Sequence, residues 1–303
     1  MLTAAQLRAA RRGAAVGPLL APAFLRLSGK DARSYLHRMS TQDLERLAPG
    51  QSAYAAFLSA RGRLLADAHV LVREEEVLLA VEPAVAPDLR RHLEAYVIMD
   101  EVAVADGPRL GVLPVLGPEG PARADGRAPG APRVPNGRRG VPAVDLWLEP
   151  AAGEALRAAL EADGLPALGE EELEALRIAG GAARLGADVD GSRLPMEAGL
   201  TRAAISFTKG CYIGQEVVVR ATARGHLQRG LVQLALPAGA GPGTPLLAGE
   251  AEVGAVTSAA ETPEGRVGLG WLRRAHWREG ERLRAGDGEA VVTRVVVEDG
   301  LPA

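Results

Sequence analysis

The part of the chain beyond residue 226 restricts the fold most strongly. Short apolar segments alternate there with clusters of Gly and Pro, at residues 230–236, 244–247, 253–258, 266–272 and 290–297. Short strands separated by turn residues are typical of a small β-barrel or a β-sandwich. We therefore expect a C-terminal β-barrel domain over residues 227–303.

Antiparallel strands are also predicted in the preceding part of the chain. Residues 51–58 and 64–72 are apolar-rich runs joined by Ser59-Ala60-Arg61-Gly62, which suits a hairpin turn, and a third strand is expected at 77–81. Helices are expected at residues 4–12, 32–39 (with Asp31 as the N-terminal cap), 87–96, 151–162 and 170–178. The predicted fold class is therefore α+β, with antiparallel sheets in region 1–226 and a small β-barrel after it.

One long segment inside the first region shows no regular pattern. Residues 117–142 are rich in Gly, Pro and Arg and have neither a helical nor a strand period. We expect a mobile surface loop there. It divides region 1–226 into two expected subdomains.

Composition excludes several classes of protein. The formal net charge of -3 provides no field that would hold a polyanion, so we expect no direct binding of nucleic acid. The longest apolar run, residues 14–25, is shorter than the ~20 residues that span a bilayer and contains Gly17, Pro18 and Pro22. With no apolar surface stripe in the sequence, we expect a monomer that does not contact membranes.

The first thirty residues carry arginines and a lysine but no acid. This composition is shared by organellar transit peptides and by a short amphipathic helix at residues 4–12. The preference of the whole chain for Ala, Gly and Arg favours the helix and a bacterial, cytoplasmic protein.

Metal-ligating residues are sparse. Cys211 is the only cysteine, which rules out an internal disulfide, a zinc site of several thiolates and a cluster held by the usual ~4 cysteines of one chain. The histidines are at least 23 residues apart in the sequence, at positions 37, 69, 92, 226 and 276. We therefore expect no metal site.

Scarce residue types are concentrated in residues 205–216. This window holds one of the two lysines, the only cysteine, one of three phenylalanines, one of four tyrosines and two of four isoleucines. Because the chain otherwise uses Arg in place of Lys, the concentration indicates that these residues are kept for a specific purpose.

The chemistry of this window suggests a reactive site. An ammonium is a compact point charge that a planar guanidinium cannot replace, so Lys209 should touch something specific. The thiol of Cys211, two residues away, would become a thiolate near that cation and near a helix beginning at Gly214. Gly210 and Gly214 would let the backbone approach a ligand closely.

Other interpretations of these residues stay open. A lone cysteine is often a small buried hydrophobe, and Tyr212 suits a core position as well as a ligand platform. Arg220, Arg224 and Arg229 could simply form a solvated face. The run 217–219 consists of valines, which weakens the prediction of a helix after Gly214.

The segment 209–216 reads Lys-Gly-Cys-Tyr-Ile-Gly-Gln-Glu and, with Arg220, resembles the signature of the YgfZ-type folate-binding family. Residues 27–32, 41–44 and 62–70 look like the N-terminal part of the wider superfamily that includes the glycine-cleavage T-protein. Residues 195–200 resemble the segment that precedes the signature, and 253–258 resemble the superfamily's C-terminal β-barrel.

The resemblance implies domains arranged as a ring around a central channel that holds tetrahydrofolate or another reduced folate. It implies that Cys211 reacts and that the folate is contacted by Lys209, Gly210, Tyr212, Gly214, Gln215, Glu216, Arg220 and Glu197. The family is implicated in assembly or repair of iron–sulfur proteins, including radical enzymes that modify tRNA. The implied partners are therefore folate and, transiently, iron–sulfur proteins or cluster-assembly factors.

The T-protein relatives, which are aminomethyltransferases, suggest a second candidate catalytic residue. They place an aspartate of the early hairpin beside the folate nitrogen that attacks the substrate, and Asp67 is similar in position. The stretch 64–68 has one carboxylate where T-proteins commonly show an acidic pair. Asp67 is thus either a catalytic residue or a plain hairpin residue.

Three hypotheses result. The first, which the signature favours, is a folate-binding accessory protein in which Cys211 handles a sulfur, iron or one-carbon species. The second is a folate-dependent aminomethyltransferase that acts on an aminomethyl or N-methyl donor. The third is a non-catalytic module for another anion.

Overall fold

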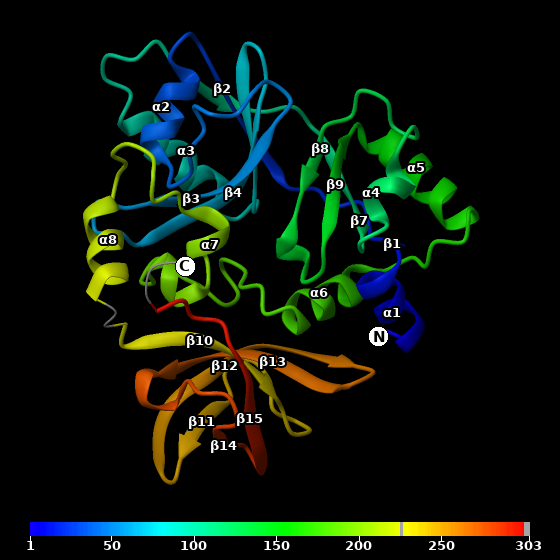
Figure 1. Cartoon of the computed structure of the whole chain (residues 1–303), viewed down its shortest axis with the longest axis vertical. Helices are drawn as coiled ribbons and strands as arrows, with labels where there is room; N and C mark the ends of the chain where they lie inside the picture. The colour runs from blue at the N-terminus through cyan, green and yellow to red at the C-terminus, as the bar shows by residue number, and fades with distance from the viewer. Residues whose placement is uncertain (225–226, 300–303) are drawn as a thin grey trace.

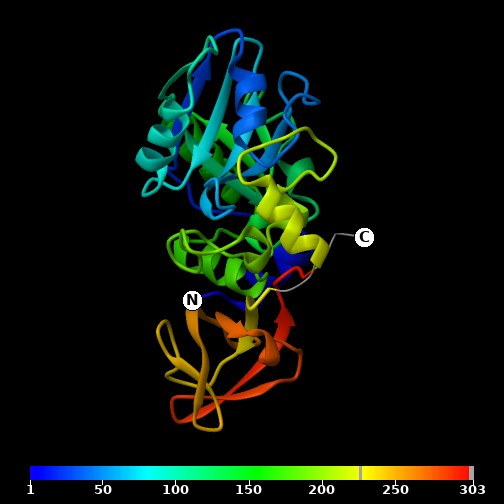
Figure 2. The ribbon, with the colours of Figure 1, turned by 90° about the vertical axis from the view of Figure 1, so that its left-hand side faces the viewer.

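Two β-sheets lie side by side at one end of the molecule and a β-barrel lies at the other (Figure 1). This computed structural model describes residues 1–224 and 227–299. The predicted boundary near residue 226, the side chain of His226 and the end of the predicted barrel domain at 303 fall outside those ranges. Figure 2 shows from the side that the barrel and the five-stranded sheet occupy opposite ends.

The five-stranded sheet is antiparallel, with strand order β3-β4-β5-β2-β6. Its strands are β2 (Ala23–Ser28), β3 (Ser52–Leu58), β4 (Leu64–Val72), β5 (Glu76–Val81) and β6 (Ala103–Asp106). The helices α2 (Ala32–Met39) and α3 (Ala86–Ala95) pack on one face, where Phe57, Val70 and Leu79 are fully buried. The predicted hairpin, third strand and both helices are confirmed.

The capping role predicted for Asp31 is wrong. Asp31 stands before α2, but its side chain makes no capping hydrogen bond. Its Oδ2 instead accepts a hydrogen bond from the backbone N–H of Glu101 at 2.8 Å. The carboxylate therefore ties the start of α2 to the segment before β6, a contact between residues far apart in the sequence.

The second sheet has four strands in the order β1-β7-β9-β8. They are β1 (Ala15–Val16), β7 (Gly111–Leu116), β8 (Arg133–Pro135) and β9 (Ala143–Leu148), covered by α1 (Ala4–Arg12), α4 (Gly120–Ala124) and α5 (Pro150–Ala162). Every residue of β7 is buried, since the helices and the first sheet lie on either side of it. The helices predicted at 4–12 and 151–162 are confirmed.

The prediction of an irregular loop over residues 117–142 is wrong. The segment contains α4, β8 and a 3-10 turn, η1 (Gly137–Arg139). β8 pairs with β9, and Asn136 Nδ2 donates to Asp145 Oδ2 at 2.8 Å. These tertiary contacts supply the order, so no local sequence period could show it.

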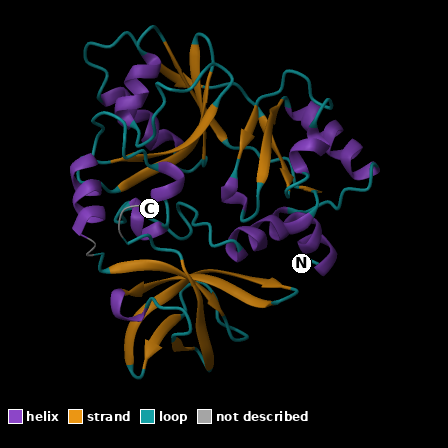
Figure 3. Ribbon diagram, viewed as in Figure 1, coloured by secondary structure: helices purple, strands orange, loops and turns teal. Residues whose placement is uncertain are grey.

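The C-terminal strands form a closed six-stranded barrel in the order β10-β13-β12-β11-β14-β15 (Figure 3). They are β10 (Arg229–Ala235), β11 (Pro245–Ala248), β12 (Ala251–Thr262), β13 (Gly265–Arg273), β14 (Arg282–Ala285) and β15 (Gly288–Val295), with a 3-10 turn η3 (Arg274–His276) after β13. The predicted barrel is confirmed. Sequence reasoning missed β14, whose four residues bury only two side chains, Leu283 and Ala285.

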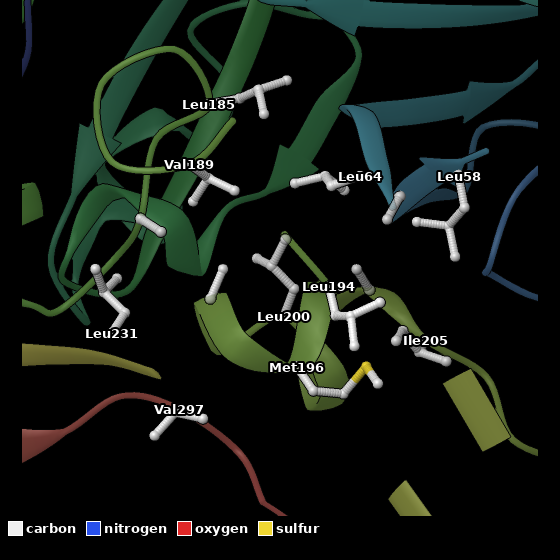
Figure 4. Close-up of a cluster of buried hydrophobic side chains, with 14 of the residues drawn as sticks. Leu58, Leu64, Leu185, Val189, Leu194, Met196, Leu200, Ile205, Leu231 and Val297 are labelled. Carbon is white, nitrogen blue, oxygen red and sulfur yellow. The ribbon is translucent and has the colours of Figure 1, made fainter. Parts of the chain in front are cut away.

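The segment between the sheets and the barrel carries the helix α6 (Glu170–Ala179), the 3-10 turn η2 (Pro195–Ala198), α7 (Thr201–Ala204) and α8 (Gln215–Arg224). Side chains from three parts of the chain meet there in one core, which includes Leu58, Leu64, Leu194, Met196, Leu200, Leu231 and Val297 (Figure 4). Each such side chain stabilises the fold by about 1.5–3 kcal/mol. This core fixes the hairpin, the connecting segment and the barrel against one another.

No helix in residues 1–224 or 227–299 combines the length and the apolar character needed to cross a bilayer.

Candidate functional site

A cavity of about 530 Å³ lies between the two sheets and α6. Tyr54 and Asp67 reach it from the hairpin, Arg138 from η1, Trp147 from β9 and Arg177 from α6. Cavities of roughly 300–1,000 Å³ with apolar walls and a few polar groups are the usual sites for small organic ligands. The two strands of the hairpin and the segment once expected to be a loop thus build one site.

Strand alternation places Asp67 in this cavity. Its neighbours Ala66 and Val70 face the core under α2 and α3, whereas Asp67 and His69 belong to the opposite face of β4. The hydroxyl of Tyr54 donates to Asp67 Oδ2 at 2.7 Å. Burial raises the pKa of Asp67 above its usual value, and burial together with the charge of Asp67 raises that of Tyr54, so the phenol stays a donor.

Two buried polar atoms of the cavity wall have no hydrogen-bond partner among the described residues. They are Arg138 Nε and His69 Nδ1. The Arg138 guanidinium is positioned by its Nη2, which donates to Ala183 O at 2.8 Å, and it lies 5.6 Å from the Tyr54 ring centre. Burial lowers the pKa of His69 to about 4, so its imidazole is neutral at pH 7. Such groups call for a partner, which a polar ligand or an ordered water can supply.

Lys209 has a different environment from the one that the sequence suggested. Its ammonium donates to the carbonyls of His37, Ser40 (2.7 Å) and Gln42 (3.1 Å), at the end of α2. It also lies 5.1 Å from the ring centre of Tyr212. Burial lowers the pKa of Lys209 to about 8. Since three acceptors take its three N–H groups, the geometry gives Lys209 a structural role, and its predicted contact with folate has no support here.

The residues next to Lys209 divide into exposed and buried ones. Cys211 and Gly210 are exposed, and α8 begins only at Gln215. Tyr212 is 8% exposed and belongs to the core between the sheets and the barrel, so the core interpretation is the right one for it. Burial raises the pKa of Tyr212 to about 12. The buried-hydrophobe interpretation of Cys211 is excluded.

The other residues that the resemblance suggested for folate also lie outside the cavity lined by Asp67. Glu216 and Arg220 form an exposed ion pair on α8, with side chains 84% and 58% exposed, and Gln215 begins that helix. Glu197 is buried, and its Oε2 accepts from the backbone N–H of Leu194 at 2.9 Å. The side chain of Arg224 is not part of the described structure. A folate contact by any of these residues stays a prediction.

The signature segment packs at the turn of the hairpin. A side chain at Gly62 would meet Val217 of α8 at 2.8 Å. Asp67 follows Gly62 by five residues and lies within β4. Cys211 is not among the residues that line the cavity of Asp67, so the two residues predicted to be catalytic do not share that cavity.

Gly214 is required by the backbone itself. Its φ is +82°, and a Cβ there would lie 2.7 Å from Ser59 O. We expect Gly214→Ala to lower the free energy of unfolding by about 2 kcal/mol or more, measured by urea denaturation. Gly210→Ala is the matched control, because nothing lies within 4 Å of a Cβ there, and it should change the free energy by less than about 0.5 kcal/mol. Equal effects of both substitutions would contradict this account.

Sequence reasoning missed Tyr54, Asn136 and Arg138. Tyr54 could have been found, since it is a rare aromatic residue in a strand paired with the one that holds Asp67. The other two lie in the segment expected to be irregular, and an arginine carries little signal in so arginine-rich a chain. Among the described residues, no group of three or more His, Cys, Asp or Glu side chains could hold a metal ion.

Comparisons with known proteins define the class. A model of the GCVT N-terminal domain matches residues 2–123, and one of the CAF17 C-terminal beta-barrel domain matches residues 228–298. The fold is similar to that of the glycine cleavage system aminomethyltransferase T from Bartonella henselae, with a TM-score of 0.82 over 99% of this chain and 92% of that chain, at 21% identity. This is a GcvT-like fold with a CAF17-type barrel.

Curated relatives narrow the class to a family. The mitochondrial iron-sulfur cluster assembly factor IBA57 of Homo sapiens is 30% identical over 316 residues, covering 92% of this chain and 83% of that protein. The tRNA-modifying protein YgfZ of Edwardsiella ictaluri (strain 93-146) is 27% identical over 296 residues, with the same coverages. The chain belongs to the GcvT-like family that contains the proteins named IBA57 and YgfZ.

Proposed function

We propose that this protein binds tetrahydrofolate or another reduced folate in the cavity lined by Asp67, and supports the assembly or repair of iron–sulfur clusters. The folate-binding part of this proposal rests on the polar groups that line the cavity. The carboxylate of Asp67 accepts hydrogen bonds, whereas the buried Nε of Arg138 is a donor without a partner. A pterin ring presents N–H groups and a carbonyl oxygen on neighbouring edges and so suits both.

The remaining walls suit the flat part of such a ligand. Leu20, Val112 and Trp147 supply apolar surface, and Trp147 is fixed by an edge-on contact with Phe24 at 4.9 Å between ring centres. Tyr54 holds one oxygen of Asp67 and leaves the other free to accept from the ligand. When bound, a reduced folate supplies ring nitrogens that carry one-carbon units.

The second half of the proposal rests on the relatives named above and on Cys211. A relative is named as an iron–sulfur cluster assembly factor. Cys211 is exposed on the segment at the hairpin turn, outside the folate cavity, so a partner protein can reach its sulfur. We assign to this thiol the transient handling of a sulfur or iron species during an encounter with a client or a cluster-assembly factor.

Two measurements test the proposal. Calorimetry with tetrahydrofolate should give saturable binding to the wild type. Failure of folate to compete with a different bound anion would instead favour a non-catalytic module for that anion. Cys211→Ala should keep the fold and the folate affinity but lose support of a cluster-dependent enzyme in cells that lack the native protein. Thr208→Ala, an exposed change in the same segment, is the control. Full support by the Cys211 variant would reject the role of the thiol.

Asp67 also favours a second candidate function, an aminomethyltransferase. A hydrogen-bonded carboxylate in the cavity could orient a folate nitrogen toward an aminomethyl group or an N-methyl donor. Incubation with tetrahydrofolate and such a donor should then yield methylenetetrahydrofolate. Absence of product above background would reject this candidate and leave the accessory role.

A further inference from the structure

A second cavity, of about 390 Å³, lies on the other side of the connecting segment. It is lined by residues 186–190, by parts of β12 and β13, and by Arg193, Arg229 and Arg273. We call it the arginine groove. Asp188 lines it, whereas Arg177, its ion-pair partner at 2.6 Å, lines the folate cavity. This buried pair is part of the wall between the two cavities, so the groove is a separate site.

Two arginines of the groove lie opposite each other in a sheet, an arrangement of like charges that β-sheets usually avoid. Arg229 of β10 and Arg273 of β13 are directly opposite each other in the antiparallel register. Like charges in opposed positions destabilise a sheet. Both side chains are exposed and neither makes an ion pair within the described residues, although the nearby carboxylate of Glu197 interacts electrostatically with Arg229.

The carboxylates that line the groove make no direct ion pair with Arg229 or Arg273 within the described residues. Asp188 pairs with Arg177, and Asp190 accepts hydrogen bonds from the backbone N–H and the hydroxyl of Ser192. Glu252 lines the groove but is exposed and makes no ion pair within the described residues. With Asp188 counted against Arg177, three arginines face two carboxylates, Asp190 and Glu252, so the lining keeps one net positive charge.

The third arginine is held in place by an aromatic ring. The guanidinium of Arg193 lies 4.2 Å from the ring centre of Trp271, and the indole N–H of Trp271 donates to Asp188 O at 2.6 Å. A guanidinium stacked on a ring keeps its N–H edge free for hydrogen bonds. Arg193 thus presents donors at a fixed position beside Arg229 and Arg273.

We propose that the arginine groove binds a small phosphate-bearing molecule. A terminal phosphate carries about −1.5 to −2 charges and three acceptor oxygens, which matches several guanidinium groups that converge on one cavity. A carboxylate has less charge and fewer acceptors for them. The concave site and the net charge of -3 favour a small anion over a nucleic acid.

Calorimetry with pyrophosphate and with inorganic phosphate tests the proposal. We expect the wild type to bind pyrophosphate, and Arg229→Gln and Arg273→Gln each to weaken it about tenfold or more, since each removes a charged hydrogen-bond donor. Arg284→Gln is the matched control, because Arg284 is an exposed arginine of β14 outside the groove. It should leave the affinity unchanged.

Thermal unfolding without ligand separates this role from a structural one. Removing one of two opposed arginines relieves repulsion, so Arg273→Gln should unfold at the same temperature as the wild type or at a higher one. The proposal is overturned by absence of pyrophosphate binding at millimolar concentration, by equal binding to all variants, or by tighter binding of citrate or a short oligonucleotide. Tetrahydrofolate affinity should be unchanged in the groove variants, so this test does not depend on the folate proposal.

Discussion

Lys209→Met should lower the free energy of unfolding by about 3–5 kcal/mol, because three backbone carbonyls lose their shared donor. The ammonium satisfies the carbonyls of His37, Ser40 and Gln42, and methionine fills the space without a donor. Each carbonyl left unpaired costs about 1–3 kcal/mol. Urea denaturation followed by circular dichroism measures the loss.

The chain provides a matched control for this experiment, its second lysine. Lys30 is 65% exposed and pairs with an equally exposed Glu101, so Lys30→Met should change the free energy of unfolding by less than about 1 kcal/mol. Lys209→Arg should fail to restore stability, because a planar guanidinium cannot direct its donors to the same three carbonyls. A Lys209→Met protein as stable as the wild type would contradict the structural role of this residue.

Asp67→Asn should weaken tetrahydrofolate binding about 10- to 100-fold, because a charged acceptor is replaced by a neutral amide. Tyr54 can still donate to the amide oxygen, so the shape of the cavity is kept. Binding of tetrahydrofolate to the wild type should also weaken on acidification, as pH falls through the raised pKa of Asp67 and the carboxyl takes up a proton. Calorimetry at several pH values measures both effects.

The stability of the same variant gives an independent check. The pKa of Asp67 is higher in the folded than in the unfolded protein, so the folded state binds more protons between the two values and stability falls as pH rises through them. At pH 7 the buried, ionised Asp67 therefore lowers the stability of the wild type. Asp67→Asn removes this charge, so the variant should be at least as stable as the wild type at pH 7. Asp287→Asn, an exposed change in the barrel, should alter neither affinity nor stability. An Asp67→Asn protein that binds tetrahydrofolate as tightly as the wild type would contradict the assignment of the folate site to this cavity.

Much of the fold followed from the sequence because local patterns and tertiary structure agree. The hairpin at Ser59–Gly62 and the barrel strands combine apolar runs with turn residues, and both form as expected. α8 forms although Val217, Val218 and Val219 disfavour it, since Val218 is fully buried in the central core. β8 was missed because three residues that pair with β9 carry no period of their own.

The site was harder to predict than the fold. The scarcity of lysine indicated that Lys209 has specific partners, but Ser40, which accepts one of its hydrogen bonds, is 169 residues earlier in the chain. Nothing local could distinguish those carbonyls from a ligand. Asp67 was identified through the resemblance, whereas Arg138 became visible only when the fold brought η1 to the hairpin.

A crystal structure of the protein with tetrahydrofolate tests the central claim most directly. Our account predicts density for the pterin in the cavity between the sheets, within hydrogen-bond distance of the Asp67 carboxylate and the Arg138 guanidinium. Density for the ligand beside Lys209 and Cys211, with the cavity lined by Asp67 left to solvent, would contradict it.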